Sequence, residues 1–291
     1  MKFGIHSNDT RDVGYKIAMK LSRLLIKKGC VPVFEESLKD SVISSLSGVQ
    51  FGAFDDVDVI VSIGGDGTFL SVISTFRKLD KPFIGINKGS IGFLTEVSEY
   101  NMDDAFDLII EGNYTILNRM QLRIEHYDKN GNLKGSDICL NDLSVLRGAK
   151  PHITRLTLYI DGERVEKFYG DGLVVATPTG STAYTLAAGG PLLMPDMNNI
   201  LITPLCPHTL QNMSYVISPE SVVEIHLGNF ESVPIVCPDG REFSNIEDYD
   251  ILRIRKHDYP CRTICLNTTG FFQNVRRKIL ARGSFYEDGK E

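Results

Sequence analysis

The chain reads VDVIVSIGGDGTFL at residues 57–70, and this stretch is the clearest indication of how its first half folds. A β-branched, mostly apolar run of strand length ends at two glycines, and helix-compatible sequence follows Thr68. Glycine reaches backbone conformations that other residues avoid, and it has no Cβ to keep a ligand away. Backbone N–H groups at such a helix start converge on anions. The pattern predicts a strand, a phosphate-binding loop and a helix.

A second glycine-rich segment supports this interpretation, because an Asp-Gly pair alone is usually only a turn. It reads FIGINKGSIGFL at residues 83–94 and follows the next apolar run. Ligands of open α/β sheets bind at the carboxyl ends of strands, where both segments are expected to lie. The candidate phosphate-binding residues are Gly64, Gly65, Gly67 and Thr68.

The first hundred residues alternate between strand-like and helix-like segments, which predicts βαβ units around a mostly parallel sheet. The glycine at position 29 and the glycine at position 112 each end a helical pattern. The expected strands are 3–6, 31–34, 57–63 and one opening at 82, and the expected helices are 13–25, a weaker 37–46, 69–76 and 102–110.

From about Tyr114 the sequence becomes rich in short strands with period-two alternation. Turn signals such as Asn130-Gly131 and Asp161-Gly162 separate them, and residues 251–254 and 261–266 give the last two strands. Many short strands without intervening helices predict an antiparallel β-sandwich. The expected organisation is an α/β domain (1–113), a β-sandwich domain (114–266) and a tail (267–291) whose helical pattern has an apolar face that needs a partner.

Composition excludes several classes of protein. A net charge of −6 without a long basic run argues against binding a nucleic-acid backbone. No apolar stretch approaches the roughly 20 residues of a membrane span, and the first residues do not resemble a signal peptide. Six scattered cysteines without a CxxC pair favour reduced thiols in a cytoplasmic protein. The spacing of Cys206, His208 and Cys237 makes zinc improbable, and no metal ligands are predicted.

The richest stretch of the second half is YGDGLVVATPTGSTAYTLAAGGP at residues 169–191. Small side chains leave room for a flat ring, Tyr184 is able to stack on it, and the hydroxyl groups are able to bind amide or sugar groups. The alternative is a capped helix, in which Ser181 or Thr182 is simply the N-cap and Tyr184 belongs to the core. The residues alone leave both interpretations open.

Taken together, these stretches resemble the NAD kinase family. The loop at 64–68 is weakly specific, because diacylglycerol-type lipid kinases and phosphofructokinases carry similar loops. The block TPTGSTAY at 177–184 is far more specific. The resemblance also includes residues 85–94, the pair Asn141-Asp142 and Asp171, and it runs from about Phe3 to the turn at 239–240 and into the tail.

This resemblance implies an ATP-dependent transfer of phosphate to the 2′-hydroxyl of the adenosine ribose of NAD, giving NADP. It implies an amino-terminal α/β domain and a β-sandwich domain with the NAD site between them, and a tail that packs back on the first domain. It also implies Mg²⁺ or another divalent metal, ATP and NAD as substrates, and a homo-oligomer, either a dimer or a tetramer. Neither a nucleic acid nor a membrane is an expected partner.

The family's functional residues are expected at matching positions of this sequence. Asp66 matches the catalytic aspartate, which would orient the 2′-hydroxyl and accept its proton. Asn141 and Asp142 match a pair that binds ribose hydroxyls, and Asp171 matches a carboxylate that contacts the dinucleotide. His152 falls where the family places a basic or polar contact. The segment expected to enclose the rings comprises Thr182, Ala183, Tyr184, Thr185, Leu186 and Ala187.

Three positions depart from the family pattern. Asp142 stands where many relatives have glutamate, so its shorter side chain must reach the same partner differently. Ser71 replaces a basic or polar residue after the glycine loop, which puts one phosphate contact in doubt. Arg241 stands where glutamine is common, and its fixed charge is either inert or directed at a phosphate or a neighbouring subunit.

Two rival functions remain at this point. A lipid or sugar kinase would share the glycine loop, but the block that contains Tyr184 and the pair Asn141-Asp142 argue against it. A non-catalytic nucleotide sensor on the same fold is disfavoured by the presence of Asp66.

Overall fold

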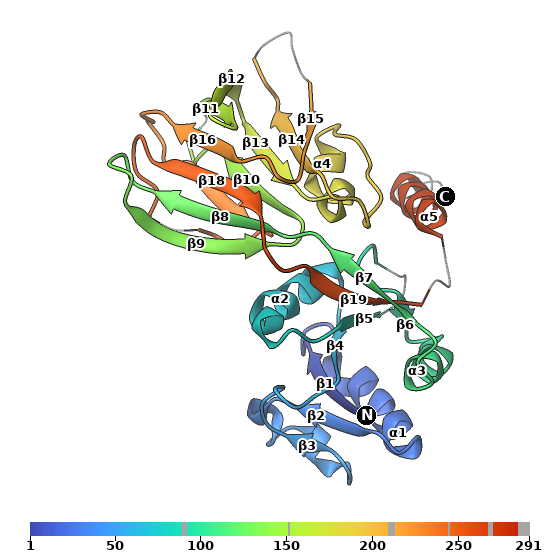
Figure 1. The fold of residues 1–291 in the computed structure, drawn as a ribbon. Helices are drawn as coiled ribbons and strands as arrows, with labels where there is room; N and C mark the ends of the chain where they lie inside the picture. Colours follow the sequence, from blue (N-terminus) through green and yellow to red (C-terminus); the bar gives the residue numbers. More distant parts are fainter. Residues whose placement is uncertain (89–91, 151, 209–212, 244, 267–269, 285–291) are drawn as a thin grey trace, which may run out of the picture. The chain divides into compact units, whose positions relative to one another are not determined.

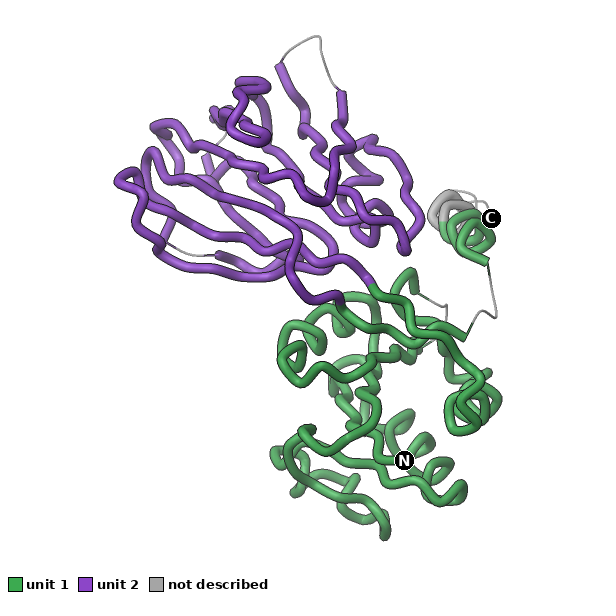
Figure 2. Tube along the Cα trace, in the orientation of Figure 1, with its two compact units in different colours: residues 1–118, 261–291 green, residues 119–260 purple. Residues whose placement is uncertain are grey.

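The computed structural model describes residues 1–88, 92–150, 152–208, 213–243, 245–266 and 270–284. The chain divides into two compact units (Figure 2). The first comprises Met1–Asn118 and Cys261–Glu291, and the second comprises Arg119–Pro260. Within the described ranges, no helix combines the length and the apolar character needed to cross a membrane.

The first unit is built on one predominantly parallel sheet with the strand order β3-β2-β1-β4-β5-β19-β7, and β6 also pairs with β5 (Figure 1). The order reverses between β1 and β4, and ligands of such sheets bind beyond the carboxyl ends of strands at that kind of point. The strands are β1 (Lys2–Ser7), β2 (Val31–Phe34), β3 (Gln50–Phe51), β4 (Val59–Ile63), β5 (Phe83–Asn87), β6 (Val97–Ser98), β7 (Thr115–Arg119) and β19 (Cys261–Cys265). The helices are α1 (Lys16–Lys27), α2 (Asp66–Phe76), α3 (Met102–Ile110) and α5 (Phe271–Ser284).

Successive residues of β1 face opposite sides of the sheet, because side chains alternate between the faces of a strand. Phe3 packs against Phe106 of α3 with ring centroids 5.5 Å apart. Gly4 faces the other way, where a Cβ would lie 2.9 Å from Cγ of Phe54. Phe54 in turn packs on Phe76 of α2 at 4.8 Å. Both faces of the parallel sheet are therefore covered, as expected for βαβ units.

Three details of the first unit differ from the sequence pattern, and the first is that β7, expected among the antiparallel strands from 114 onward, belongs to the first sheet. The weak helix expected at 37–46 is replaced by two 3₁₀ turns, Glu36–Leu38 and Val42–Ser45. The Ser41 hydroxyl accepts a hydrogen bond from the Ile43 N–H at 3.3 Å, and serines that bond to nearby backbone groups compete with helix formation. Strand β19, expected among the antiparallel strands, pairs in parallel with β5 through Thr263 and Phe83. Its Ile264 is buried in the core of the first unit, which alternation alone does not reveal.

The second unit consists of two antiparallel sheets that share one apolar core. The expected combination of an α/β unit with a mostly parallel sheet and an antiparallel β unit is confirmed. The short helix α4 (Tyr184–Ala187) follows a 3₁₀ turn at Thr179–Thr182. One sheet has the strand order β15 (Tyr215–Ile217), β14 (Ile200–Leu205), β13 (Gly172–Ala176), β10 (Asp142–Leu146) and β17 (Ile235–Pro238). The other sheet has the strand order β12 (Glu163–Gly170), β11 (Thr154–Ile160), β16 (Val223–Leu227), β18 (Ile251–Lys256), β8 (Leu122–Tyr127) and β9 (Leu133–Cys139).

Candidate functional site

The glycine loop turns from β4 into α2 in two residues. Gly64 lies against Thr68, and a Cβ at Gly64 would meet the Thr68 Oγ1 at 2.4 Å, so the loop closes on itself only with glycine there. Gly65 is the N-cap of α2, and its carbonyl accepts the N–H of Phe69 at 3.0 Å. A Cβ added at Gly65 or Gly67 would meet no atom of the described residues within 4 Å, so that side of the loop is open to a ligand. The N-terminus of α2, which carries the positive end of the helix dipole, lies at this loop.

Asp66 begins α2 and is held by the second glycine-rich segment. Its Oδ2 accepts the N–H of Phe93 at 2.9 Å, and its Oδ1 accepts the N–H of Leu94 at 3.2 Å. The hydroxyl of Thr95 lies 3.4 Å from Oδ1. The two segments therefore meet at one edge of the sheet, and the Asp66 carboxylate, with a third of its side chain exposed, is fixed in orientation by main-chain donors.

Gly92 is the residue that makes room for this carboxylate. A Cβ there would lie 1.8 Å from Asp66 Oδ1 and 2.3 Å from Thr95 Oγ1. The Gly92 N–H also donates to Thr95 Oγ1 at 2.8 Å. The sequence places Gly92 in a glycine-rich loop, but only the folded chain reveals that its missing side chain seats Asp66.

In the second unit, Asn141 and Asp142 lie at the start of β10 and are anchored by Asp239. The Asp239 carboxylate accepts the N–H of Leu140 at 2.8 Å, that of Asn141 at 2.7 Å and that of Asp142 at 3.3 Å. The sequence alone identifies Asp239 only as part of a turn. An Asp-Gly pair after an apolar strand carries no local signal of a partner almost a hundred residues away.

The block at 177–184, which contains Tyr184, is hydrogen-bonded to the residues just before β10. The Thr177 hydroxyl donates to the Leu140 carbonyl at 2.6 Å and accepts the N–H of Gly180 at 3.1 Å. A Cβ at Gly180 would lie 2.1 Å from the Asn141 carbonyl oxygen. Gly180 is thus required because the backbones of residues 180 and 141 approach each other closely. Residues 177–184 therefore pack directly against the segment that contains Asn141 and Asp142.

Two polar side-chain atoms in or beside these two segments are buried without a partner in the described residues. They are Oδ1 of Asn141 and, just after the block at 177–184, Oγ1 of Thr185; the other such atoms of the described residues lie outside these two segments. A buried polar atom without a hydrogen bond costs on the order of 1–3 kcal/mol, so each marks a place where a ligand is able to supply the missing bond.

Tyr184 begins α4, and 41% of it is exposed. The N-cap of α4 is Ala183, without a side-chain hydrogen bond, so neither Ser181 nor Thr182 caps this helix. The Ser181 hydroxyl instead donates to the Pro178 carbonyl at 2.7 Å. Burial, followed by the negative charges of neighbours that include Asp171 and Asp142, raises the pKa of the Tyr184 hydroxyl. The alternative interpretation, in which Ser181 or Thr182 caps the helix and Tyr184 belongs to the core, is therefore wrong.

Asp142 carries the largest electrostatic perturbation of these residues. Burial and the neighbouring charge of Asp239 raise the pKa of Asp142 to about 7. The pKa of Asp239 is also raised by its burial, although the three N–H donors and Arg241 oppose that change. The three main-chain donors make Asp239 the better stabilised of the two carboxylates in its charged form, and Asp142 is the one whose protonated form is favoured.

Asp142→Asn is expected to stabilise the folded protein at pH 8 and to leave its stability at pH 5 much less changed. The folded state binds a proton at Asp142 between the unfolded pKa of 3.8 and about 7, so wild-type stability falls as pH rises through that window. Asparagine has the same size and no charge to bury, and the gain at pH 8 is on the order of a few kcal/mol. Melting temperatures at both pH values test this, with Asp171→Asn as the control at a more exposed carboxylate. An equal shift at pH 5 and pH 8 would contradict it.

The remaining predicted residues lie in other surroundings. Asp171 joins β12 to β13, and its Oδ1 lies 3.3 Å from Nε of Arg147. His152 is half-exposed, with Nδ1 3.4 Å from Oε2 of Glu231, a residue outside the predicted set. The Arg241 guanidinium donates to the Ile138 carbonyl at 3.0 Å and pairs with Asp137 on β9. Its charge is therefore engaged within the second unit.

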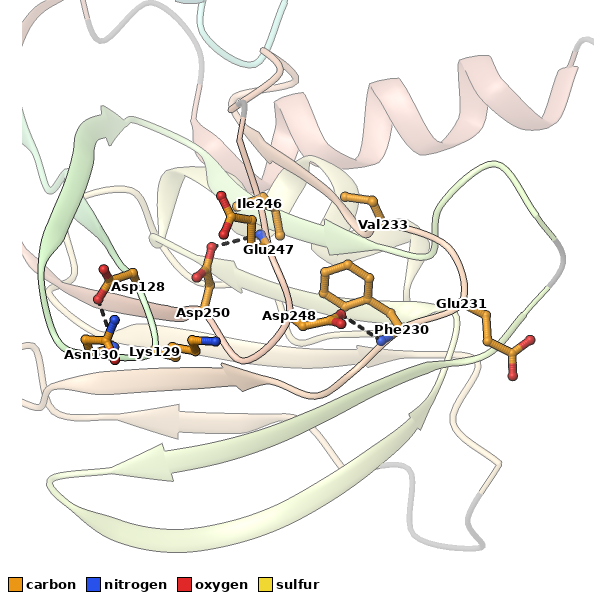
Figure 3. Close-up of a pocket in the computed structure, with 10 residues that line it drawn as sticks. All are labelled: Asp128, Lys129, Asn130, Phe230, Glu231, Val233, Ile246, Glu247, Asp248 and Asp250. Atoms are coloured by element: carbon orange, nitrogen blue, oxygen red, sulfur yellow. Dashed lines mark hydrogen bonds between the residues drawn. The ribbon is translucent and has the colours of Figure 1, made fainter.

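A pocket of about 510 Å³ in the second unit is lined by none of the predicted site residues, although Glu231, the partner of His152, is part of its lining (Figure 3). Two of its carboxylates accept hydrogen bonds from the loops that line it. Asp128 accepts the N–H of Asn130 at 2.8 Å, and Asp248 accepts the N–H of Phe230 at 3.0 Å. Turn formation therefore accounts for two of the acidic lining residues, Asp128 and Asp248. The lining residues are Asp128, Lys129, Asn130, Phe230, Glu231, Val233, Ile246, Glu247, Asp248 and Asp250.

Comparison with known proteins gives a consistent result. The family described as the ATP-NAD kinase N-terminal domain matches residues 3–114, and the ATP-NAD kinase C-terminal domain matches residues 140–266. The NAD kinase of Ruminiclostridium cellulolyticum is 36% identical over 97% of this chain and 98% of its own length. That of Geotalea daltonii is 32% identical over 94% of this chain and 95% of its own.

Two solved structures share the fold. Yeast NADH kinase, crystallised with NADH, has a TM-score of 0.86 at 23% identity and covers 95% of this chain and 86% of its own. An NAD kinase from Archaeoglobus fulgidus, in complex with ATP, has a TM-score of 0.73 at 24% identity and covers 96% of this chain and 98% of its own.

Proposed function

This chain belongs to the NAD kinase family, and we infer that it transfers the γ-phosphate of ATP to the 2′-hydroxyl of the adenosine ribose of NAD, giving NADP. The observation that carries the inference is the carboxylate of Asp66, which two main-chain N–H groups hold beside an open glycine loop. A lipid or sugar kinase and a non-catalytic sensor are not favoured, since relatives named NAD kinase match along nearly the whole chain.

We assign Asp66 the role of general base. Phosphoryl transfer needs positioning and charge stabilisation more than covalent catalysis by the protein. A carboxylate whose orientation is fixed by the N–H groups of Phe93 and Leu94 is able to hold the attacking hydroxyl in line and to take its proton as the new bond forms. The N–H groups at the start of α2, beside Gly65 and Gly67, would bind the phosphates of ATP.

A divalent ion such as Mg²⁺ fits the donor chemistry of this loop. Mg²⁺ usually reaches kinases on the phosphates of the nucleotide and takes only one or two carboxylates from the protein. Asp66, the one carboxylate of residues 64–71, has a third of its side chain exposed and would supply such a ligand. When bound, the ion neutralises part of the charge of the triphosphate.

We assign the dinucleotide contacts to the second unit. The partnerless Oδ1 of Asn141 and Oγ1 of Thr185 would accept hydrogen bonds from hydroxyl or amide groups of NAD. Asp142 and Asp171 would contact ribose hydroxyls and the dinucleotide, and the exposed ring of Tyr184 would stack on a base. For His152 we propose only a polar contact with the dinucleotide, because its side chain lies beside Glu231. The enclosing segment is again Thr182, Ala183, Tyr184, Thr185, Leu186 and Ala187.

The activity is tested by incubating the purified protein with ATP, Mg²⁺ and NAD and measuring NADP with an NADP-specific dehydrogenase. We expect NADP to accumulate in proportion to ADP. Omission of Mg²⁺ is expected to abolish the reaction. Consumption of ATP without NADP, with phosphate on a sugar or a diacylglycerol offered in parallel, would instead support the rival kinases. The homo-oligomeric state implied by the family resemblance and the cytoplasmic location expected from the composition stay predictions.

Tyr184→Ala is expected to weaken NAD binding by roughly 0.5–1.5 kcal/mol or more beyond the loss of contact area, because stacking on a ring is lost. Tyr184→Phe keeps the ring and should bind NAD nearly as well as the wild type. Since 41% of Tyr184 is exposed, neither change should lower the melting temperature of the ligand-free protein by much. Calorimetric titration with NAD and a thermal melt measure both quantities. An alanine variant that melts early but binds NAD normally would assign Tyr184 to the core.

A further inference from the structure

The last described helix, α5, brings a lysine to the proposed catalytic carboxylate. Nζ of Lys278 lies 3.7 Å from Oδ2 of Asp66, more than 200 residues away in the sequence. The same ammonium lies 4.4 Å from the ring centroid of Phe93, whose N–H donates to that carboxylate oxygen. The Lys278 side chain is 21% exposed. A cation over an aromatic face and beside a carboxylate is held in place by both.

The charge of the two glycine-rich segments explains why a cation is needed there. Residues 64–71 contain one charged side chain, Asp66, and it is negative. Ser71 stands where the family resemblance predicts a basic or polar contact to phosphate. Residues 83–95 contain one basic residue, Lys88, whose side chain is exposed. A triphosphate that arrives beside Asp66 therefore meets a carboxylate of the same sign, and a positive charge at this point lowers the cost of bringing them together.

The geometry of the pair leaves the ammonium able to bind a phosphate. At 3.7 Å the contact with Asp66 is longer than a hydrogen bond, so the attraction is mainly Coulombic. A lysine ammonium has three donors on a flexible stem. It is able to stay near Asp66 and to donate to a phosphoryl oxygen at the same time.

We propose that Lys278 is a catalytic residue that contacts the transferred phosphoryl group from the C-terminal helix; this inference rests on the proposed NAD kinase activity. The ribose 2′-oxygen forms a bond to the γ-phosphorus while the bond from that phosphorus to the β–γ bridging oxygen breaks. The electron pair of the broken bond leaves with ADP, and the proton of the 2′-hydroxyl passes to Asp66, which later releases it to water. Lys278 keeps its protons throughout and stabilises the negative charge of the phosphoryl oxygens.

The test compares Lys278→Met, which keeps the length and removes the charge, with Lys278→Arg and with Arg276→Met. Arg276 is an exposed basic residue on the same helix and serves as the matched control. We expect Lys278→Met to lower kcat about 10- to 100-fold, less than the loss of a lone oxyanion donor because the metal shares the charge. The KM for NAD should change less than about twofold, arginine should restore part of kcat, and Arg276→Met should match the wild type.

A second variant separates catalysis from folding. Lys278→Ala leaves space for a small cation, and propylammonium chloride should raise its kcat relative to sodium chloride at the same ionic strength. If Lys278→Met melts early, this rescue decides the matter, since a fold defect is not repaired by an amine of the size of the missing group. Wild-type kcat in Lys278→Met, or a loss in Lys278→Ala without rescue, overturns the proposal. Absence of NADP formation by the wild type would overturn the proposed function itself, which is a different result.

Discussion

Asp66→Asn is expected to lower kcat on the order of 10²–10⁴-fold, or roughly 3–5 kcal/mol of transition-state stabilisation. Asparagine keeps the size of the side chain and removes the proton acceptor. The proposed partner of Asp66 is the attacking hydroxyl, whose charge changes only during the transfer. An interaction made only in the transition state lowers kcat and kcat/KM together. NAD affinity, measured separately by calorimetry, should therefore change little.

The contrast with a binding carboxylate makes the result specific. Asp171→Asn should mainly raise the KM for NAD, because its proposed partner on the dinucleotide stays unchanged through the reaction. Steady-state kinetics of both variants under the same conditions provide the comparison. Near-normal kcat in Asp66→Asn would remove Asp66 as the base and leave the glycine loop as a phosphate-binding element only.

Gly92→Ala is expected to lower kcat about 100-fold or more with only a modest change in melting temperature. The new methyl group would lie 1.8 Å from Asp66 Oδ1, so the carboxylate must move by about 1 Å or more. That movement breaks the hydrogen bonds from the N–H groups of Phe93 and Leu94, which hold the base in position. Asp66 remains present and ionisable, but it no longer points at the hydroxyl.

The matched control is Gly135→Ala in β9, where a Cβ would meet only Cζ of Phe243 at an ordinary 3.4 Å. It should leave kcat unchanged. Steady-state rates and thermal melts of both alanine variants check the prediction. If Gly92→Ala retained wild-type kcat, the position of Asp66 between the two segments would not be what the reaction requires.

The local sequence determined the elements that hold the site. Residues 57–70 give a buried strand, a loop and a helix because the apolar period and the glycines are properties of neighbouring residues. The same holds for the strand before Pro178 and for the turn into Tyr184. The resemblance then pointed to Asp66, Asn141, Asp142 and Asp171, and their roles remain predictions.

Long-range contacts, which the local sequence does not reveal, bring further residues to Asp66 and to Asn141. Gly92 seats Asp66, Gly180 admits the backbone of Asn141, and Asp239 anchors the bend that leads into β10. Lys278 reaches Asp66 across more than 200 residues, and β19 returns to the first sheet. These contacts depend on which strand pairs with which and on how closely two backbones approach. The apolar alternation within one segment predicts neither property, because the same alternation is compatible with a strand of the parallel sheet or of an antiparallel sheet.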